Sequence, residues 1–107
     1  MRTFHSTYQP FMSLGVVEVS AQRNVLNESH MNRIVVATGS VIEKIILPHS
    51  KDVIGEIIGI GNAATHGLDI ELLPHWGQSI DMMSRTTLPF SNTSLLMAYA
   101  DGFVIYE

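Results

Sequence analysis

The sequence predicts an all-β fold, an antiparallel β-sandwich of jelly-roll-like type. Short runs of β-branched and aromatic residues, each closed by Gly, Pro, Asn or Asp, recur about every eight to twelve residues. No stretch repeats apolar residues with the 3.6-residue period of a helix. Isoleucine and valine, which favour strands, are abundant. Spacing does not reveal strand order, so other sandwiches and a closed barrel are alternatives.

In the first half of the chain, three runs are expected to be strands: residues 16–19, 33–37 and 41–47. Thr38-Gly39-Ser40 is a good turn after the second run, and Pro48 ends the third because proline lacks the N–H that a central ladder needs. The polar segment 24–31 between the first two strands is expected to be a loop or a single helical turn.

In the second half, strands are expected at residues 53–60, 68–72, 79–83, 86–90, 94–100 and 103–106. Strict alternation places Asp69 and Glu71 on one face of the second of these strands. Pro89 favours an edge position for the strand at 86–90. Asp101-Gly102 is a strong two-residue hairpin turn between the last two strands.

Composition favours a homo-oligomer. The 107 residues are enough for one domain with a small core. Charged residues make up only 15% of the chain, and the mean hydropathy is +0.21. A small domain this apolar has more apolar side chain than it can hide alone, and burial between subunits is the natural outlet. The alternative is a monomer with an unusually apolar surface.

The charge pattern excludes several partners. The net charge is −4, and the six lysines and arginines form no cluster, so nucleic acid is not an expected partner. No cysteine is present, which excludes disulfides and thiolate metal sites. No apolar run is long enough for a transmembrane helix, so no membrane insertion is expected, and the N-terminus lacks the apolar core of a signal peptide.

The first fifteen residues differ from the rest because their large apolar side chains follow no regular period. Phe4, Tyr8, Phe11 and Met12 are set among polar residues. They are interpreted as an extended arm that docks onto a particle surface, an ordinary first strand or frayed terminus being the alternative. The predicted organisation is thus an attachment arm with the first strand in residues 1–30 and a β-sandwich domain in residues 31–107.

No catalytic or metal-binding pattern is found. The five histidines are too far apart in sequence for the usual local metal motifs. Asp69 and Glu71 are interpreted as a solvated strand face, and no serine lies in a nucleophile elbow. The glycines at 55, 59 and 61 lie in a strand pattern and do not open a helix, so they do not form a phosphate cradle. A non-enzyme without a cofactor or metal is therefore expected.

One loop could bind a ligand. His75-Trp76-Gly77 places the only tryptophan of the chain between two expected strands. An indole on a loop can stack against a sugar ring. The alternative is that His75 and Trp76 serve packing or a subunit interface.

The last sixty or so residues contain a specific order of elements. An apolar strand ending in Leu-Pro is followed by a Gly-led strand ending in Gly-Asn. Next come an alternating strand, an Ile-Asp element, a serine-led strand, and an Asp-Gly turn before an aromatic-rich terminus. These elements are segments 45–48, 55–62, 68–74, 78–81, 94–97 and 101–106. In this order they resemble the small β domains of phage fibre and virion-appendage proteins, with two departures: Met82 stands in place of a glycine and Phe103 in place of a tryptophan.

This resemblance implies a trimeric β-sandwich in a virion, assembled in the host cytoplasm. The stretch before residue 45 is too short for a fibre shaft. A capsid decoration, head-fibre or short tail-appendage subunit is therefore expected, with the major capsid or tail proteins of the same virion as its partners. The alternative is a receptor- or carbohydrate-binding module at a fibre tip, which would contact a host surface glycan through Trp76.

Overall fold

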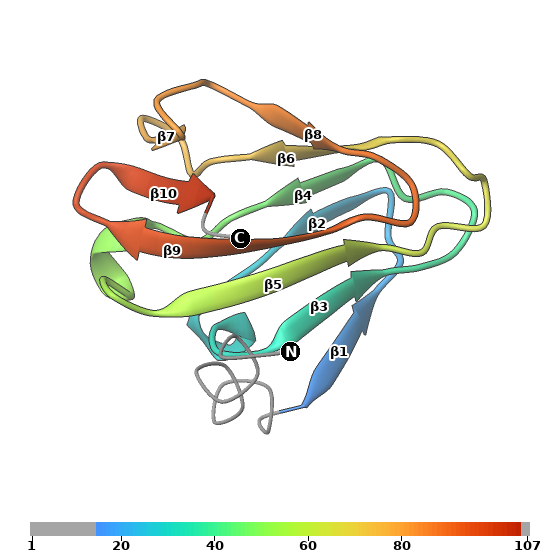
Figure 1. Ribbon diagram of the computed structural model, residues 1–107, viewed down its shortest axis with the longest axis horizontal. Coiled ribbons are helices and arrows are strands. Elements are labelled where there is room, and N and C mark those ends of the chain that lie inside the picture. Colours follow the sequence, from blue (N-terminus) through green and yellow to red (C-terminus); the bar gives the residue numbers. More distant parts are fainter. Residues whose placement is uncertain (1–14, 106–107) are drawn as a thin grey trace, which may run out of the picture.

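The computed structural model describes residues 15–105, which form two β-sheets packed face to face (Figure 1). The all-β class is confirmed. In spatial order, sheet A contains β1 (Val16–Val19), β3 (Ile34–Ala37), β5 (Ile57–Asn62), β9 (Thr93–Tyr99), β10 (Gly102–Ile105) and β7 (Ser79–Ile80). Sheet B contains β2 (Arg23–Val25), β4 (Lys44–Ile46), β6 (Ile70–Leu73) and β8 (Thr86–Leu88). Two single-turn 3₁₀ helices, η1 (Glu28–His30) and η2 (Ser50–Asp52), lie in connections.

The first six strands wind as a β-solenoid, alternating between the two sheets. Each coil adds one strand to each sheet, parallel to its predecessor. In sheet A, Val16 lies opposite Ile34, and Ile34 lies opposite Gly59. In sheet B, Arg23 lies opposite Lys44 in the same parallel sense. Antiparallel pairing occurs between β5 and β9, β9 and β10, and β6 and β8.

The predicted antiparallel, jelly-roll-like order is therefore wrong for the first six strands. Parallel strands need a crossover connection, and here the crossover is a strand of the other sheet with its two corners. A hairpin starts its second strand beside the first after a short turn, and a solenoid coil starts its next strand in the opposite sheet after an equally short turn. Because their spacing in sequence is the same, the pattern of runs could not distinguish the two.

Hydrogen bonds between successive corners explain how the coils stack. Thr38 N donates to Val19 O at 2.9 Å, and Thr65 N donates to Gly39 O at 2.8 Å. Gly39 has φ +87°, a conformation that glycine adopts without strain. The turn predicted at residues 38–40 is thus present, but it leads from one sheet to the other.

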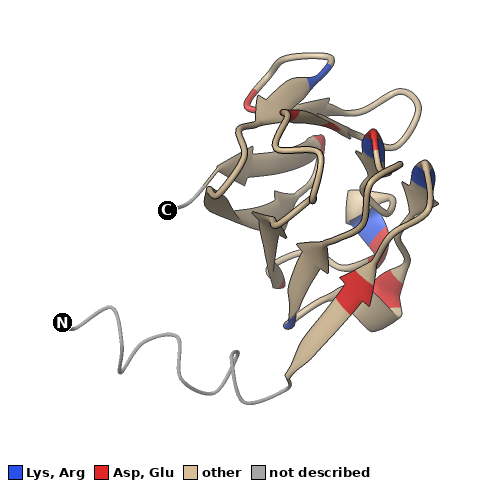
Figure 2. Ribbon diagram, turned by 90° about the vertical axis from the view of Figure 1, so that its right-hand side faces the viewer, with Lys and Arg blue, Asp and Glu red and all other residues tan. Residues whose placement is uncertain are grey.

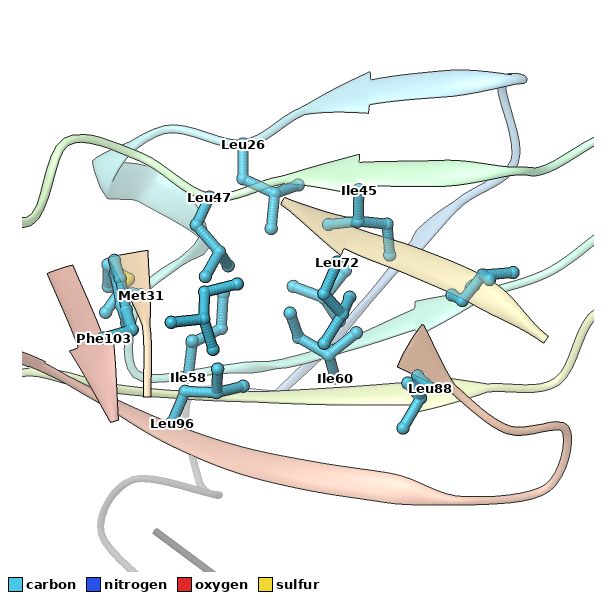
Figure 3. Packing of buried hydrophobic residues seen from close by; sticks show 14 of the residues in the cluster. Leu26, Met31, Ile45, Leu47, Ile58, Ile60, Leu72, Leu88, Leu96 and Phe103 are labelled. Carbon is cyan, nitrogen blue, oxygen red and sulfur yellow. The ribbon is translucent and has the colours of Figure 1, made fainter. Parts of the chain in front are cut away.

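The core lies between the sheets and is apolar (Figure 3). Its largest fully buried side chains include Phe103, Ile58 and Leu96 from sheet A and Ile45 and Leu72 from sheet B. Within residues 15–105, the buried polar side chains are those of Ser50 and Asn62. Both are hydrogen-bonded, as burial of a polar group requires.

Several predicted strands are shorter in the structure. The run at 41–47 is a strand only over Lys44–Ile46, and the run at 53–60 becomes a strand only at Ile57. Gly55 has φ +85° and forms part of a turn before β5. The segment 24–31 contains the end of β2 and the predicted single turn, η1, which Asn27 and His30 cap reciprocally.

The β8 edge strand and the loop around Trp76 are confirmed, and the predicted hairpin between the last two strands is present. Its two-residue turn is Ala100-Asp101 rather than Asp101-Gly102, because Gly102 already belongs to β10 and lies opposite Tyr99. β1 and β2 pair with β3 and β4, so these early strands belong to the same two sheets as the rest of the chain. The predicted arm residues Phe4, Tyr8, Phe11 and Met12 lie outside the described residues.

Candidate ligand-binding loop and assembly face

Trp76 lies on the loop between β6 and β7 and is 91% exposed. Gly77, with φ +85°, follows it in the left-handed region. A side chain this large and this exposed contributes little to the core. Trp76 therefore does not serve packing within its own subunit. Its indole face is available to a partner or ligand.

Three loops, including the one that carries Trp76, meet at the buried residue Ser50. The Ser50 backbone N–H donates to Gln78 Oε1 at 2.8 Å, and Gln78 Nε2 donates to Ser50 Oγ at 2.7 Å. Ser50 Oγ in turn donates to the carbonyl oxygen of Ala100 at 3.5 Å. These bonds join η2 to the Trp76 loop and to the β9–β10 turn, so the loop is anchored at Gln78 to a buried residue.

Two histidines adjoin the indole. The rings of His49 and His75 meet edge to face, with centroids 4.8 Å apart. His49 Nδ1 accepts from Lys51 N at 3.3 Å, and His75 Nδ1 lies 3.1 Å from Trp76 O. A shallow cavity of about 380 Å³ lies here, lined by His49, Lys51, His75, Trp76, Gln78 and Asp101 among others. The structure therefore brings the predicted loop residues His75 and Trp76 together with residues from two other loops.

The outer face of sheet A is a second candidate surface, which the sequence analysis missed. The side chains that alternate with the core positions on β1, β3, β5, β9 and β10 point away from sheet B. Those that are apolar are Val16, Ile34, Val36, Ile57, Leu95, Met97, Tyr99 and Val104. Within the six strands of sheet A, Glu18 is the only charged residue. Figure 2 shows charged residues mainly along sheet B, the loops and the β1 margin.

Gly59 allows side chains from the two neighbouring strands to touch on this outer face. A Cβ atom at Gly59 would lie 2.5 Å from Ile34 Cδ1 and 3.1 Å from Leu95 Cδ2. The absence of a side chain on β5 thus allows Ile34 and Leu95 to meet across the strand, and Leu95 is only 7% exposed. A glycine inside a strand is typical of places where a neighbouring group comes close.

The apolar face continues beside the turn before β9. A cavity of about 400 Å³ lies next to Ile34 and Val36 and is bordered by Phe90, which is 45% exposed. The sequence does carry a signal for this face. Runs such as Arg33–Ala37 and Ser94–Tyr99 are apolar almost throughout, without the alternation of a strand that faces water on one side.

The remaining polar candidates have structural surroundings. Asp69 and Glu71 line a groove of about 600 Å³ on the outside of sheet B, and Glu71 accepts from Arg85 at 3.3 Å. His66 joins two corners, with Nε2 2.8 Å from Ile42 O and Nδ1 accepting from Leu68 N. In the part of the chain that the structure describes, no group of three or more His, Cys, Asp or Glu side chains could hold a metal ion. Over the same residues, no helix is long and apolar enough to cross a membrane.

Comparison with known proteins assigns no family. No protein-family model matches the chain, and no curated protein matches it. Among solved structures, the chain is similar to a fragment of StcE from enterohemorrhagic E. coli, residues 132–251. The two are 14% identical with a TM-score of 0.48, and the match covers 78% of this chain and 87% of the fragment.

Proposed function

We propose that this protein is a non-catalytic structural subunit of a virus particle, which forms a homotrimer through the outer face of sheet A. The observation that carries the proposal is the apolar outer face itself, whose strands carry a single charged residue, Glu18. Single exposed apolar residues are ordinary on protein surfaces, whereas a contiguous patch marks an interaction site.

The chemistry of this face suits a second copy of the same chain. Burying a charge in an interface is costly unless it is paired, and the face offers only Glu18, at its margin. Val16 on the edge strand β1 is 63% exposed, so the apolar surface extends to that margin. Apolar centres with few charges are typical of the interfaces of permanent oligomers.

The size of the face is consistent with an interface centre. Five strands about 4.8 Å apart, with four or more residues each, span a flat area of roughly 300 Å². A stable interface buries about 800 Å² on each partner. The face would thus form the apolar centre, and the surrounding loops, including the one that carries Phe90, would form the rim.

The virion assignment rests on the ordered elements between residues 45 and 106 that resemble phage fibre and head-fibre domains. The absence of a metal cluster from residues 15–105 is compatible with a structural role but does not test it. In this proposal the subunit assembles in the host cytoplasm, and residues 1–14 attach the trimer to a major capsid or tail protein.

A matched pair of substitutions tests the assembly face. Val36→Glu places a carboxylate on the outer face of sheet A, and Val41→Glu places the same group on the sheet B side, where Val41 is 59% exposed. In light scattering coupled to size exclusion, the parent chain should have a mass of about 35 kDa, three times the 11.8 kDa of one chain. Val36→Glu should reduce that mass to one chain, and Val41→Glu should leave it unchanged.

A monomeric parent chain at micromolar concentration would refute the trimer. Equal behaviour of the two variants would refute the choice of face. Circular dichroism of both variants shows whether the fold is retained. The virion assignment has its own test, which is gold labelling of purified particles with an antibody to this chain; particles without label would overturn it.

A further inference from the structure

We infer that the Trp76 loop is a carbohydrate-binding site, a function separate from the proposed structural role. The site consists of the exposed indole, the His49–His75 ring pair and the polar residues of the adjoining cavity. Sugar rings carry an apolar face of C–H groups and a rim of hydroxyl groups. A ligand of that kind needs one aromatic platform and several polar groups around it.

The platform is fixed before any ligand arrives. Buried Ser50 holds Gln78 and the β9–β10 turn, and Gln78 lies two residues after Trp76. A tryptophan loses few rotatable bonds on binding, and a tethered loop loses little entropy. Two hydrogen bonds between Gln78 and buried Ser50 thus anchor the loop close to Trp76.

The polar rim matches hydroxyl groups in particular. The Nδ1 atoms of His49 and His75 lie at hydrogen-bonding distance from backbone groups, whereas their Nε2 atoms have no hydrogen-bond partner within residues 15–105. Lys51 and Asp101 are exposed and both line the cavity. Donors and acceptors are thus both present, as hydroxyl groups require.

The charges and polarity of the site favour a sugar over the other ligands that stack on tryptophan. Single-stranded nucleic acid needs a basic groove for its phosphates, yet Lys51 is accompanied by Asp101 and the chain carries a net charge of −4. A membrane surface needs an apolar rim around the indole, and this rim is polar. The cavity, about 380 Å³, lies near the lower end of the volumes of small-molecule sites, which begin at about 300 Å³.

Trp76 is the only tryptophan of the chain, so the tryptophan fluorescence of the protein reports directly on this site. The full-length protein is first applied to a printed array of bacterial and animal oligosaccharides. Each oligosaccharide retained on the array is then titrated against tryptophan fluorescence with iodide as a quencher. Binding should shift the emission to shorter wavelength and protect the indole, which is 91% exposed in the free chain.

Two variants make the test specific. Trp76→Ala should weaken binding at least tenfold in isothermal calorimetry, and Trp76→Phe should weaken it less because a smaller ring remains. Val41→Ala is the control, since Val41 is 59% exposed on the sheet B side, away from this site and from the outer face of sheet A, and it should leave the affinity unchanged. The measurement does not depend on the oligomeric state, so it can fail while the structural role stands.

Three outcomes would overturn the inference. The first is an array with no oligosaccharide above background. The second is a retained oligosaccharide whose affinity is the same for the parent chain and Trp76→Ala. The third is fluorescence that responds to anionic lipid vesicles or to oligothymidylate but to no sugar.

Discussion

Asn62 is the residue whose replacement tests the solenoid corner most sharply. Its side chain is 3% exposed at the end of β5 and makes three hydrogen bonds. Nδ2 donates to Leu68 O at 2.9 Å and to Leu88 O at 3.0 Å, and Oδ1 accepts from Ala64 N at 3.1 Å. One amide thus joins the corner after β5 to the end of β8.

Replacing Asn62 by alanine should destabilise the fold by about 3 kcal/mol. Each hydrogen bond contributes about 1 kcal/mol net, and a buried group left without a partner costs about 1–3 kcal/mol. Leu68 is 64% exposed, so water can reach its carbonyl oxygen once the amide is gone. The bonds to Leu88 O and Ala64 N lie in buried surroundings, and their loss should account for most of the effect.

Asn24→Ala is a matched control because Asn24 also makes three hydrogen bonds. It accepts from Ala21 N and donates to the carbonyl oxygens of Ala21 and Lys44, but in exposed surroundings. Water can replace all three bonds, so the expected loss is about 1 kcal/mol or less. Asn62→Asp keeps the volume and places oxygen against two carbonyl oxygens, so it should be at least as destabilising as Asn62→Ala at neutral pH.

Urea unfolding followed by circular dichroism measures all three variants. An unfolding free energy for Asn62→Ala within about 1 kcal/mol of that for Asn24→Ala would refute the reasoning, because burial would then not matter. A well-tolerated Asn62→Asp would also refute it, because the two donated hydrogen bonds would then have no role.

Two further predictions concern the end strand of sheet A and the N-terminal residues. Gly102→Ala should prevent the β10–β7 pairing and cost more than about 3 kcal/mol, since a Cβ would lie 1.9 Å from Ser79 O at φ +148°. Gly67→Ala is the control: Gly67 has φ +70° but no atom within 4 Å of an added Cβ, so the substitution should cost only about 1 kcal/mol. Thermal unfolding measures both variants, and equal melting temperatures would contradict the steric account. Removal of residues 1–14 should leave the thermal transition unchanged and abolish co-sedimentation with virus particles. Loss of the transition, or undiminished sedimentation, would count against the arm.

Local patterns in the sequence were sufficient for the elements that depend on neighbouring residues. The hairpin between the last two strands, the strand at 16–19 and the loop at Trp76 were each predicted from turn chemistry and side-chain period, although the hairpin turn lies one residue earlier than predicted. Strand boundaries were less accurate. Corner residues such as Val41 and Ile54 are as β-branched as strand residues but are exposed and lie outside the ladders.

The structure groups the site residues in a way that no spacing could predict. Ser50, Gln78 and Ala100 are far apart in the chain and meet only because η2, the Trp76 loop and the β9–β10 turn lie at the same end of the sheets (Figure 1). The apolar outer face has the same origin, since Ile34 and Leu95 become neighbours only across Gly59.

The sequence by itself determined the all-β class and the low charge of this protein, because strand propensity and turn formation are local properties. The tertiary structure alone decided that the strands wind as a solenoid, since a short turn can return the chain beside itself or lead it to the opposite sheet. Which of these occurs depends on backbone hydrogen bonds between residues distant in sequence, such as Thr65 N to Gly39 O. The same long-range pairing places the apolar side chains of sheet A on one face and brings Ser50 of η2 to Gln78 of the Trp76 loop.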